Sequence, residues 1–297
     1  MPQLRANGID LEYETSGDPQ GTPVLFIMGL GAPLTRWPID FLQPFVDAGY
    51  YVIRFDNRDV GLSTKMSGKA KLGRTALFSA LGLPSHPPYS LYDMASDALG
   101  LLDGLSRKRA HLIGVSMGGM IAQILAAKHP ERVRSLVSIM SNSGSRSVPG
   151  PSLSLRLELL RRSPFSDRNA RILRTAQILK QIGSKTHPRA LTELRTLVEK
   201  EYERGVHLAG YFRQLAAIIG SESRLPLLAG LRVPTLILHG TEDPLVPEAA
   251  AHDLHWRIPS SQLEVIAGMG HDLPAPLLPR ITQRIVAHLA QHTPQAE

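Results

Sequence analysis

The 297-residue chain has no cysteine, no low-complexity tract and no long apolar run. Without cysteine it cannot contain a disulfide framework, a thiolate metal site or a cysteine nucleophile. The longest apolar runs have the length of strands, and no apolar signal segment follows the N-terminal residues 1–5. We therefore expect a cytoplasmic protein that does not interact with a membrane.

Acidic residues are fewer than basic ones, 26 against 33, which gives a formal net charge of +7. An excess of lysine and arginine is typical of proteins that bind nucleic acid, because these side chains neutralise phosphates. Here the basic side chains are spread along the chain and often alternate with acids, as in Glu199-Lys200-Glu201. No nucleic-acid motif accompanies them. We expect a solvated surface and no nucleic-acid partner, and the sequence leaves the oligomeric state open.

Short apolar runs alternate with helical patterns along most of the chain. Six runs rich in branched residues are typical of strands buried on both faces of a parallel sheet. The N-terminal segment 4–16, with Asn7-Gly8 as a turn, predicts an antiparallel edge hairpin. Because crossovers between parallel strands are right-handed, the pattern predicts an α/β fold with a mostly parallel, doubly wound sheet and helices on both faces. The six runs are Val24–Met28, Tyr51–Phe55, His111–Val115, Leu136–Met140, Thr235–His239 and Leu263–Ile266.

One long segment, residues 142–231, interrupts this alternation. It shows no strand pattern, and its apolar side chains recur at helical spacing, as in Leu191, Leu194 and Val198. We predict a helical cap over 142–231 that covers the carboxyl ends of the strands, on a core formed by 1–141 and 232–297. The stretch 66–89, which contains three prolines, is predicted to be irregular and to border the same opening.

Ser116 lies in the pentapeptide Gly114-Val115-Ser116-Met117-Gly118, between a strand pattern and a helical pattern. This is the G-x-S-x-G arrangement, in which a tight strand-to-helix turn exposes a serine hydroxyl. The turn strains the backbone at the serine, and the glycines leave room where a Cβ would collide with neighbouring chain. The following helix directs its free N–H groups and positive dipole end toward charge near the serine. The arrangement indicates nucleophilic attack by Ser116.

A serine nucleophile needs a base within hydrogen-bond reach and an acid that fixes the tautomer of that base. In this arrangement the chain order is serine, acid, histidine. Two loops after strands fit the order, because the first carries Glu242 and Asp243 and the second carries His271 and Asp272. Asp272 cannot easily reach the ring of its neighbour. No carboxylate follows the preceding strand, at residues 141–143.

Five blocks of sequence, in their order and spacing, resemble the capped serine branch of the α/β-hydrolase superfamily, which includes proline iminopeptidases and aclacinomycin methylesterase. The resemblance covers roughly residues 23–274 and implies that Ser116 is the nucleophile, Asp243 the orienting acid and His271 the base. Glu242 remains the alternative acid, but Asp243 matches the family position. The blocks are Met28-Gly29-Leu30-Gly31, Asp56-Asn57-Arg58-Asp59-Val60-Gly61-Leu62-Ser63, the Ser116 pentapeptide, His239-Gly240-Thr241-Glu242-Asp243 and Gly268-Met269-Gly270-His271.

The resemblance also implies two backbone N–H donors for the oxyanion of an acyl-transfer reaction. One donor is Met117, the residue after the nucleophile. The other is Leu30, with Gly31 as the alternative, in a loop where we expect Gly29 and Gly31 to contact the substrate. The family usually has a His-Gly pair at the start of this loop, and this chain has Met28 in place of the histidine. What supports the loop is therefore open.

The implied activity is hydrolysis of small or medium carboxylic esters through an acyl-enzyme, without a metal or an organic cofactor. The spacing of His252 and His255 suits a metal, but no third ligand cluster accompanies them. Asp56 and Asp59 suggest paired carboxylates, yet we expect them to brace the loop after their strand. Lactone opening and perhydrolysis need the same triad and remain alternatives.

Two further alternatives belong to other functional classes. An aminopeptidase of the proline iminopeptidase kind needs cap acids that hold the ammonium group of the substrate. A ligand-binding receptor would keep the fold and the triad but turn over little, and fold alone does not distinguish these functions. The candidates among the acids of the cap have helical neighbours that predict mostly exposed positions, and they are Glu158, Glu193, Glu199, Glu201 and Glu203.

Overall fold

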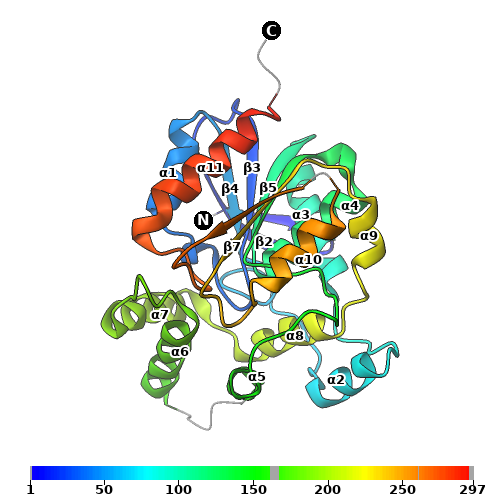
Figure 1. The fold of residues 1–297 in the computed structure, drawn as a ribbon, viewed down its shortest axis with the longest axis vertical. Coiled ribbons are helices and arrows are strands. Elements are labelled where there is room, and N and C mark those ends of the chain that lie inside the picture. Colours follow the sequence, from blue (N-terminus) through cyan, green and yellow to red (C-terminus); the bar gives the residue numbers. More distant parts are fainter. Residues whose placement is uncertain (1, 161–166, 260, 294–297) are drawn as a thin grey trace.

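Eight strands form one sheet, in the order β1-β2-β4-β3-β5-β6-β7-β8 (Figure 1). The computed structural model describes residues 2–160, 167–259 and 261–293. β1 pairs antiparallel with β2, β2 pairs antiparallel with β4, and all other neighbours are parallel. The strands are β1 (Gln3–Ala6), β2 (Ile9–Ser16), β3 (Pro23–Ile27), β4 (Tyr51–Phe55), β5 (Ala110–Val115), β6 (Val133–Ile139), β7 (Thr235–Gly240) and β8 (Ser261–Ile266).

All six predicted apolar runs are strands of this sheet. Every residue of β3, β5 and β7 is buried, as expected for strands that are covered on both faces. The predicted hairpin turn is also present, because Asn7 and Gly8 have φ angles of 48° and 80°. This left-handed conformation is the one that two-residue hairpin turns require. The predicted fold, a mostly parallel doubly wound sheet, is confirmed.

Helices cover both faces of the sheet (Figure 1). α1 and α11 lie on one face, where the rings of Trp37, Phe41 and Phe45 surround Phe26. α3, α4, α9 and α10 pack on the other face. Among the described residues, no helix combines the length and the apolar character needed to cross a membrane. The bounds are α1 (Ile39–Asp47), α3 (Leu91–Gly104), α4 (Met117–Lys128), α9 (Leu225–Gly230), α10 (Ala249–Arg257), α11 (Leu278–Ala290) and the short 3-10 turns η1 (Leu34–Arg36), η2 (Pro130–Arg132) and η3 (Ala275–Leu277).

Helices α5 to α9 lie between β6 and β7, and the described parts of 142–231 contain no strand. The first four of them lie beyond one end of the sheet (Figure 1), and we call these four the cap helices. α9 instead packs against α4 and α10 on the flank of the sheet. The cap helices are α5 (Leu153–Leu160), α6 (Arg168–Ile182), α7 (Leu191–Gly205) and α8 (Leu208–Ile219).

The segment 66–89 differs from its prediction, because it contains helix α2 (Leu72–Ala80). A helix of this length is marginal by itself and depends on packing for its stability. α2 packs against α8 of the cap, a contact between distant segments that no local pattern shows. Ala76 of α2 lines the same cavity as Ser116, so the segment does border the opening.

Candidate active site

Ser116 lies at the sharp turn between β5 and α4. Its φ of 54° and ψ of −119° belong to a region that residues other than glycine rarely adopt. Its N–H donates to the carbonyl of Ile139 on β6, at 2.9 Å. A Cβ on Gly114 would collide with the backbone of Gly118, and a Cβ on Gly118 would collide with the carbonyl of Ile27. Both glycines are therefore required, as the sequence predicted.

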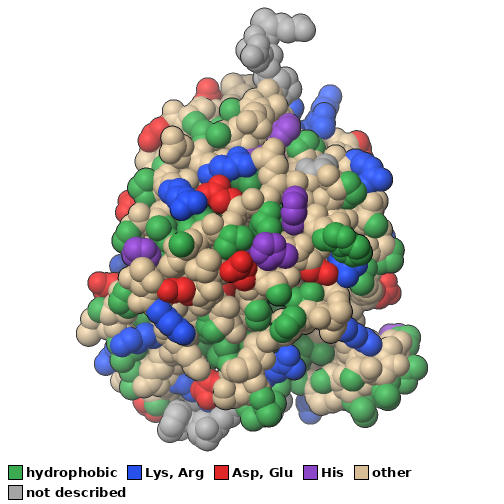
Figure 2. Space-filling model, viewed as in Figure 1, with side chains coloured by type: hydrophobic (Ala, Val, Ile, Leu, Met, Phe, Trp, Pro, Cys, Tyr) green, Lys and Arg blue, Asp and Glu red, His purple; other side chains and the backbone are tan. Residues whose placement is uncertain are grey.

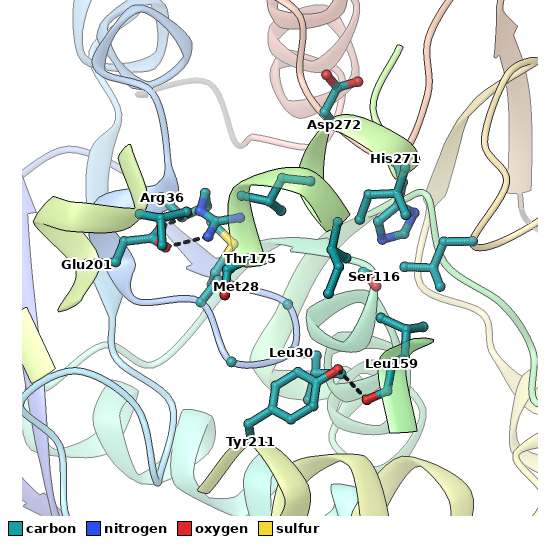
Figure 3. A pocket seen from close by; sticks show the side chains of 18 of the residues that line it. Met28, Leu30, Arg36, Ser116, Leu159, Thr175, Glu201, Tyr211, His271 and Asp272 are labelled. Carbon is teal, nitrogen blue, oxygen red and sulfur yellow. Dashed lines mark hydrogen bonds and ion pairs between the residues drawn. The ribbon is translucent and has the colours of Figure 1, made fainter. Parts of the chain in front are cut away.

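His271 contacts Asp243 and lies near Ser116, although all three residues are distant in the sequence (Figure 3). His271 Nδ1 lies 2.7 Å from Asp243 Oδ2, and the imidazole points toward Ser116 (Figure 3). Asp243 Oδ1 accepts hydrogen bonds from the N–H groups of Leu245 and Val246, at 2.9 and 2.8 Å. The Asp243 side chain is fully buried, and that of His271 is 8% exposed. The carboxylate thus holds the ring with Nε2 directed to the serine.

The other two acids of these loops bind the cap instead. Glu242 accepts hydrogen bonds from the N–H groups of Lys185 and Thr186, at 2.7 and 2.9 Å. Asp272 Oδ1 accepts from the N–H and the hydroxyl of Ser184, at 3.1 and 2.5 Å. Within the described residues neither carboxylate is hydrogen-bonded to the histidine ring. The geometry therefore favours Asp243 over Glu242 as the partner of the base.

The loop after β3 passes directly beside Ser116. A Cβ on Gly29 would lie 3.3 Å from the Cβ of Ser116, so only a very small residue fits there without displacement. The N–H of Gly31 is engaged, because it donates to a side chain of α8 at 2.8 Å. The N–H groups of Leu30 and Met117 have no hydrogen-bond partner among the described residues. These two groups, rather than Gly31, are left to bind a developing negative charge.

Two amide side chains that the sequence analysis did not single out support this loop. Asn57 Nδ2 donates to the carbonyl of Met28, at 2.9 Å. Gln214 of α8 accepts the hydrogen bond from Gly31, and its Nε2 donates to the carbonyl of Arg58 at 2.8 Å. Both side chains are buried. These two side chains support the loop after β3, in which Met28 replaces the histidine that the family usually has.

A cavity of about 1010 Å³ lies between the end of the sheet and the cap helices. Ser116 and His271 belong to its wall (Figure 3), together with apolar side chains of the cap such as Leu194, Val198 and Phe212. The volume is at the upper end of the range of about 300–1,000 Å³ that is usual for ligand pockets. The site can therefore enclose an organic molecule of considerable size beside the serine.

Asp56 and Asp59 do not form a catalytic pair. Asp59 accepts two hydrogen bonds from Arg213 of α8, at 2.8 and 2.7 Å, and one from the Tyr89 hydroxyl at 2.7 Å. Burial alone would raise the pKa of Asp59, but the hydrogen bonds from Arg213 and Tyr89 outweigh it and lower that pKa. Asp56 accepts from the N–H of Leu34, at 2.7 Å. Both carboxylates brace loops, as expected.

Glu201 lies in the wall of the cavity, so the exposed position predicted for it was wrong. It is 4% exposed, and its two carboxylate oxygens accept hydrogen bonds from Arg36 of η1. Burial opposes the charge of Arg36, but the attraction of Glu201 outweighs burial and raises the Arg36 pKa. The face of a helix that meets a cavity depends on how the helix is docked. Helical spacing in the sequence does not contain that information.

A family model described as the alpha/beta hydrolase fold matches residues 22–274. The chain belongs to the α/β-hydrolase family. Within this family, rhodomycin D methylesterase from Streptomyces peucetius is 28% identical to the chain, over 94% of the chain and 95% of that protein. Poly(3-hydroxyalkanoate) depolymerase from Ectopseudomonas oleovorans is 31% identical, over 84% of the chain and 78% of that protein. The resemblance inferred from the five sequence blocks is confirmed.

Solved structures of other hydrolases share the fold. The meta-cleavage product hydrolase from Pseudomonas fluorescens IP01 matches with a TM-score of 0.76 at 20% sequence identity. The match covers 99% of this chain and 98% of that protein. At this level of identity the likeness concerns the α/β-hydrolase fold and leaves the substrate open.

Proposed function

We propose that this chain is a serine hydrolase that cleaves carboxylic esters through an acyl-enzyme intermediate. The observation that carries the proposal is the 2.7 Å contact between His271 Nδ1 and Asp243 Oδ2, in a ring that points toward Ser116. This arrangement matches the nucleophile, base and orienting acid of a catalytic triad. The relative named as a methylesterase supports the ester as the bond that is cleaved.

The proposed reaction begins when His271 Nε2 takes the hydroxyl proton of Ser116, whose oxygen attacks the ester carbonyl. Asp243 stabilises the imidazolium that forms. The N–H groups of Leu30 and Met117 donate to the oxyanion of the tetrahedral intermediate. Its collapse breaks the bond to the leaving alcohol, which receives the proton from His271. A water molecule that gives a proton to His271 then attacks the acyl-enzyme. The second tetrahedral intermediate collapses with cleavage of the bond to Ser116, which receives the proton back from His271 as the acid is released.

The cavity supports a medium-sized, mostly apolar ester as the substrate. The exposed surface of its wall is mostly apolar, although several arginine, lysine and glutamate side chains also line it, and such pockets bind ligands mainly by burying apolar surface. A very short ester would leave most of the volume of about 1010 Å³ unfilled. We therefore expect kcat/KM to rise with acyl length before it falls.

An aminopeptidase of the proline iminopeptidase kind has less support. Such an enzyme needs a free carboxylate to hold the ammonium group of its substrate. Glu201 and Glu158 line the cavity, but Glu201 is paired with Arg36, and Glu158 lies 3.1 Å from an arginine nitrogen of α6. The three other candidate acids, Glu193, Glu199 and Glu203, are absent from the described lining. We expect no cleavage of a prolyl amide at high enzyme concentration.

Turnover of p-nitrophenyl esters from acetate to palmitate tests the proposed function. We expect sustained hydrolysis with an optimum at medium acyl length, and a loss of about 10⁶ in kcat for Ser116→Ala by analogy with other triads. Ser154→Ala, at an exposed serine of α5, is the matched control and should keep full activity. Full activity in Ser116→Ala would refute the assignment. Binding without sustained turnover of any ester, lactone or peroxide would favour a receptor instead.

A further inference from the structure

The cavity contains a part-buried ion pair in the part of its wall that lies across from Ser116 (Figure 3). The pair joins Arg36, in the short turn η1 of the core, to Glu201 on the cap helix α7. Nε and Nη2 of the guanidinium both donate to the carboxylate. The side chain of Glu201 is 4% exposed and that of Arg36 is 22% exposed. Both residues belong to the lining of the cavity.

The position of Glu201 on α7 is unusual for a charged side chain. It continues the stripe of Leu194 and Val198, the other two buried residues of this helix, at the spacing of one helix face. Removing two charges from water is costly, and apolar side chains of similar volume often give equal or greater stability. Stability alone therefore does not account for an ion pair at this place.

The pair in the cavity wall has hydrogen-bonding capacity beyond its two mutual hydrogen bonds. Arg36 Nη1 takes part in neither hydrogen bond to Glu201, and a guanidinium has five N–H donors in total. Each carboxylate oxygen of Glu201 has a second acceptor site. A hydroxyl group can bind to both residues, because its oxygen accepts a hydrogen bond from Arg36 and its O–H group donates one to Glu201.

The geometry points to Arg36 and Glu201 as a polar subsite that recognises a hydroxyl group on the part of the substrate remote from the ester. This inference rests on the proposed function, and it narrows the substrate class to esters with an apolar chain or ring system that ends in a hydroxyl. A carboxylate at that place would be repelled by the negative charge of Glu201, and an ammonium group would be repelled by the positive charge of Arg36. Because the two charges compensate each other, a neutral polar group is favoured over either ion.

Matched methyl esters test the subsite. Three methyl esters are compared at each chain length: the ester of an alkanoic acid, the ester of the corresponding ω-hydroxyalkanoic acid, and the half-ester of the corresponding dicarboxylic acid. The quantity measured for each is kcat/KM. We expect the hydroxylated ester to exceed the alkyl ester about tenfold at the length that reaches the pair, the effect of one well-formed hydrogen bond to a charged group. The half-ester should be the poorest substrate at that length.

The double variant Arg36→Met/Glu201→Leu removes both charges, so neither is left buried without a partner. We expect it to lose the preference for the hydroxylated ester, so that the ratio of kcat/KM between the hydroxylated and the alkyl ester falls to about one. The matched control is Arg195→Met/Glu199→Leu, which removes a solvent-exposed ion pair of 2.8 Å from the same helix. The control should keep the preference of the unmodified protein.

Glu201→Gln gives a second, charge-specific readout. The amide keeps a hydrogen-bonding group at this place but leaves the charge of Arg36 uncompensated. We expect the half-ester to gain about tenfold relative to the alkyl ester, because an arginine without a carboxylate partner attracts the remote carboxylate. This readout does not require the double variant to fold.

Binding to Ser116→Ala, measured by calorimetry with the same three esters, separates the subsite from the chemistry. We expect Ser116→Ala to bind the hydroxylated ester more tightly than the alkyl ester, and we expect the double substitution in the Ser116→Ala background to abolish this difference. That result supports the subsite even if no ester is turned over. Absence of turnover with that binding preference intact would overturn the proposed function alone. Equal ratios in the unmodified protein and the double variant, or a preference of the unmodified protein for the half-ester, would overturn the subsite.

Discussion

Three acids lie near the proposed base His271 in sequence or space, namely Asp243, Glu242 and Asp272, and contact geometry distinguishes among them. Asp243 is the one whose oxygen lies 2.7 Å from the ring nitrogen. Glu242, one residue earlier, has its carboxylate occupied by the N–H groups of Lys185 and Thr186. Two adjacent side chains in one loop thus point to different partners. A single-residue comparison can therefore test the triad.

Asp243→Asn should lower kcat by about 10⁴, because an amide stabilises the wrong tautomer of the histidine. Glu242→Gln, the matched control one residue away, should change kcat by less than about tenfold, because an amide oxygen can still accept from Lys185 and Thr186. Both values come from steady-state hydrolysis of one p-nitrophenyl ester. If Glu242→Gln were the more damaging substitution, the assignment of the orienting acid would be wrong.

At single residues, the sequence predicted the arrangement of the proposed triad better than the lining of the cavity. Ser116, Asp243 and His271 follow strands in a fixed order, and the geometry of such loops requires particular residue types that can be read locally. Arg36 and Glu201 meet only because η1 and α7 dock against each other. Neither lies in a local pattern that marks a site. A carboxylate at the spacing of an apolar stripe was the one available signal, and it is visible only once the orientation of α7 is known.

At the scale of elements, the cap is attached directly to the two loops that carry Asp243 and His271 through residues 182–186, which we call the anchor segment. The carbonyl of Ile182 accepts the hydrogen bond of the His271 N–H, at 2.8 Å. The hydroxyl of Ser184 donates to Asp272 and accepts from the N–H of Gly270, at 2.5 and 2.8 Å. Burial raises the pKa of Asp272 even though Ser184 donates to it. The position of His271 therefore depends on the cap.

Ser184→Ala should lower kcat by about tenfold, because the loss of two hydrogen bonds loosens the loop that holds His271. KM should change less, because Ser184 contributes only a small part of a large cavity wall. Thr196→Ala is the control, since its exposed hydroxyl donates only to a carbonyl of its own helix, at 3.1 Å. An unchanged kcat in Ser184→Ala would show that the anchor segment does not position the base.

Elements differ in how far local sequence determines them. β3 and β5 were predictable because strands buried on both faces must be apolar throughout. α2 was not, because its stability depends on packing against α8. The anchor segment connects the cap helices α6 and α7. Its hydrogen bonds to distant loops depend on tertiary packing, so the sequence of the segment itself does not predict them.

At the scale of the whole molecule, a histidine cluster lies near the C-terminus, at the end of the sheet away from the cavity. His111, at the start of β5, is fully buried between the hydroxyls of Ser135 and Thr293, at 2.8 and 3.0 Å. Burial, assisted by nearby positive groups, lowers its pKa to about 3. Burial likewise lowers the pKa of His288 on α11 to about 4. The neighbours that act on His111 are all basic, namely Arg134, His288, His292 and Arg109.

Acid should therefore destabilise the fold through these histidines. The folded protein keeps His111 neutral down to about pH 3, whereas the unfolded chain binds a proton near its ordinary pKa of 6.5. Between these values the unfolded state binds more protons, so the free energy of unfolding falls on acidification, by up to about 1.4 kcal/mol per pH unit for each histidine. Above pH 6.5 this contribution is fully present and constant.

His111→Gln should reduce that slope by up to about 1.4 kcal/mol per pH unit between pH 4 and 6, whatever its effect on stability at neutral pH. Urea denaturation at several pH values gives the slope directly. His252→Gln, at an exposed histidine of α10, should keep the original slope. Identical slopes in His111→Gln and the unmodified protein would show that the buried histidine is not the acid-sensitive group.

The central claim, that Ser116 is the activated nucleophile of this α/β hydrolase, is tested most directly by mapping a covalent adduct. The protein is treated with a fluorophosphonate, and the modified peptide is identified by mass spectrometry. The His271→Ala variant and heat-denatured protein are labelled and mapped in the same way for comparison. The account predicts rapid, stoichiometric modification of Ser116 in the folded protein, with far slower labelling in both comparison samples. An unmodified Ser116 in protein that hydrolyses esters, or an adduct on another side chain that abolishes turnover, would contradict it.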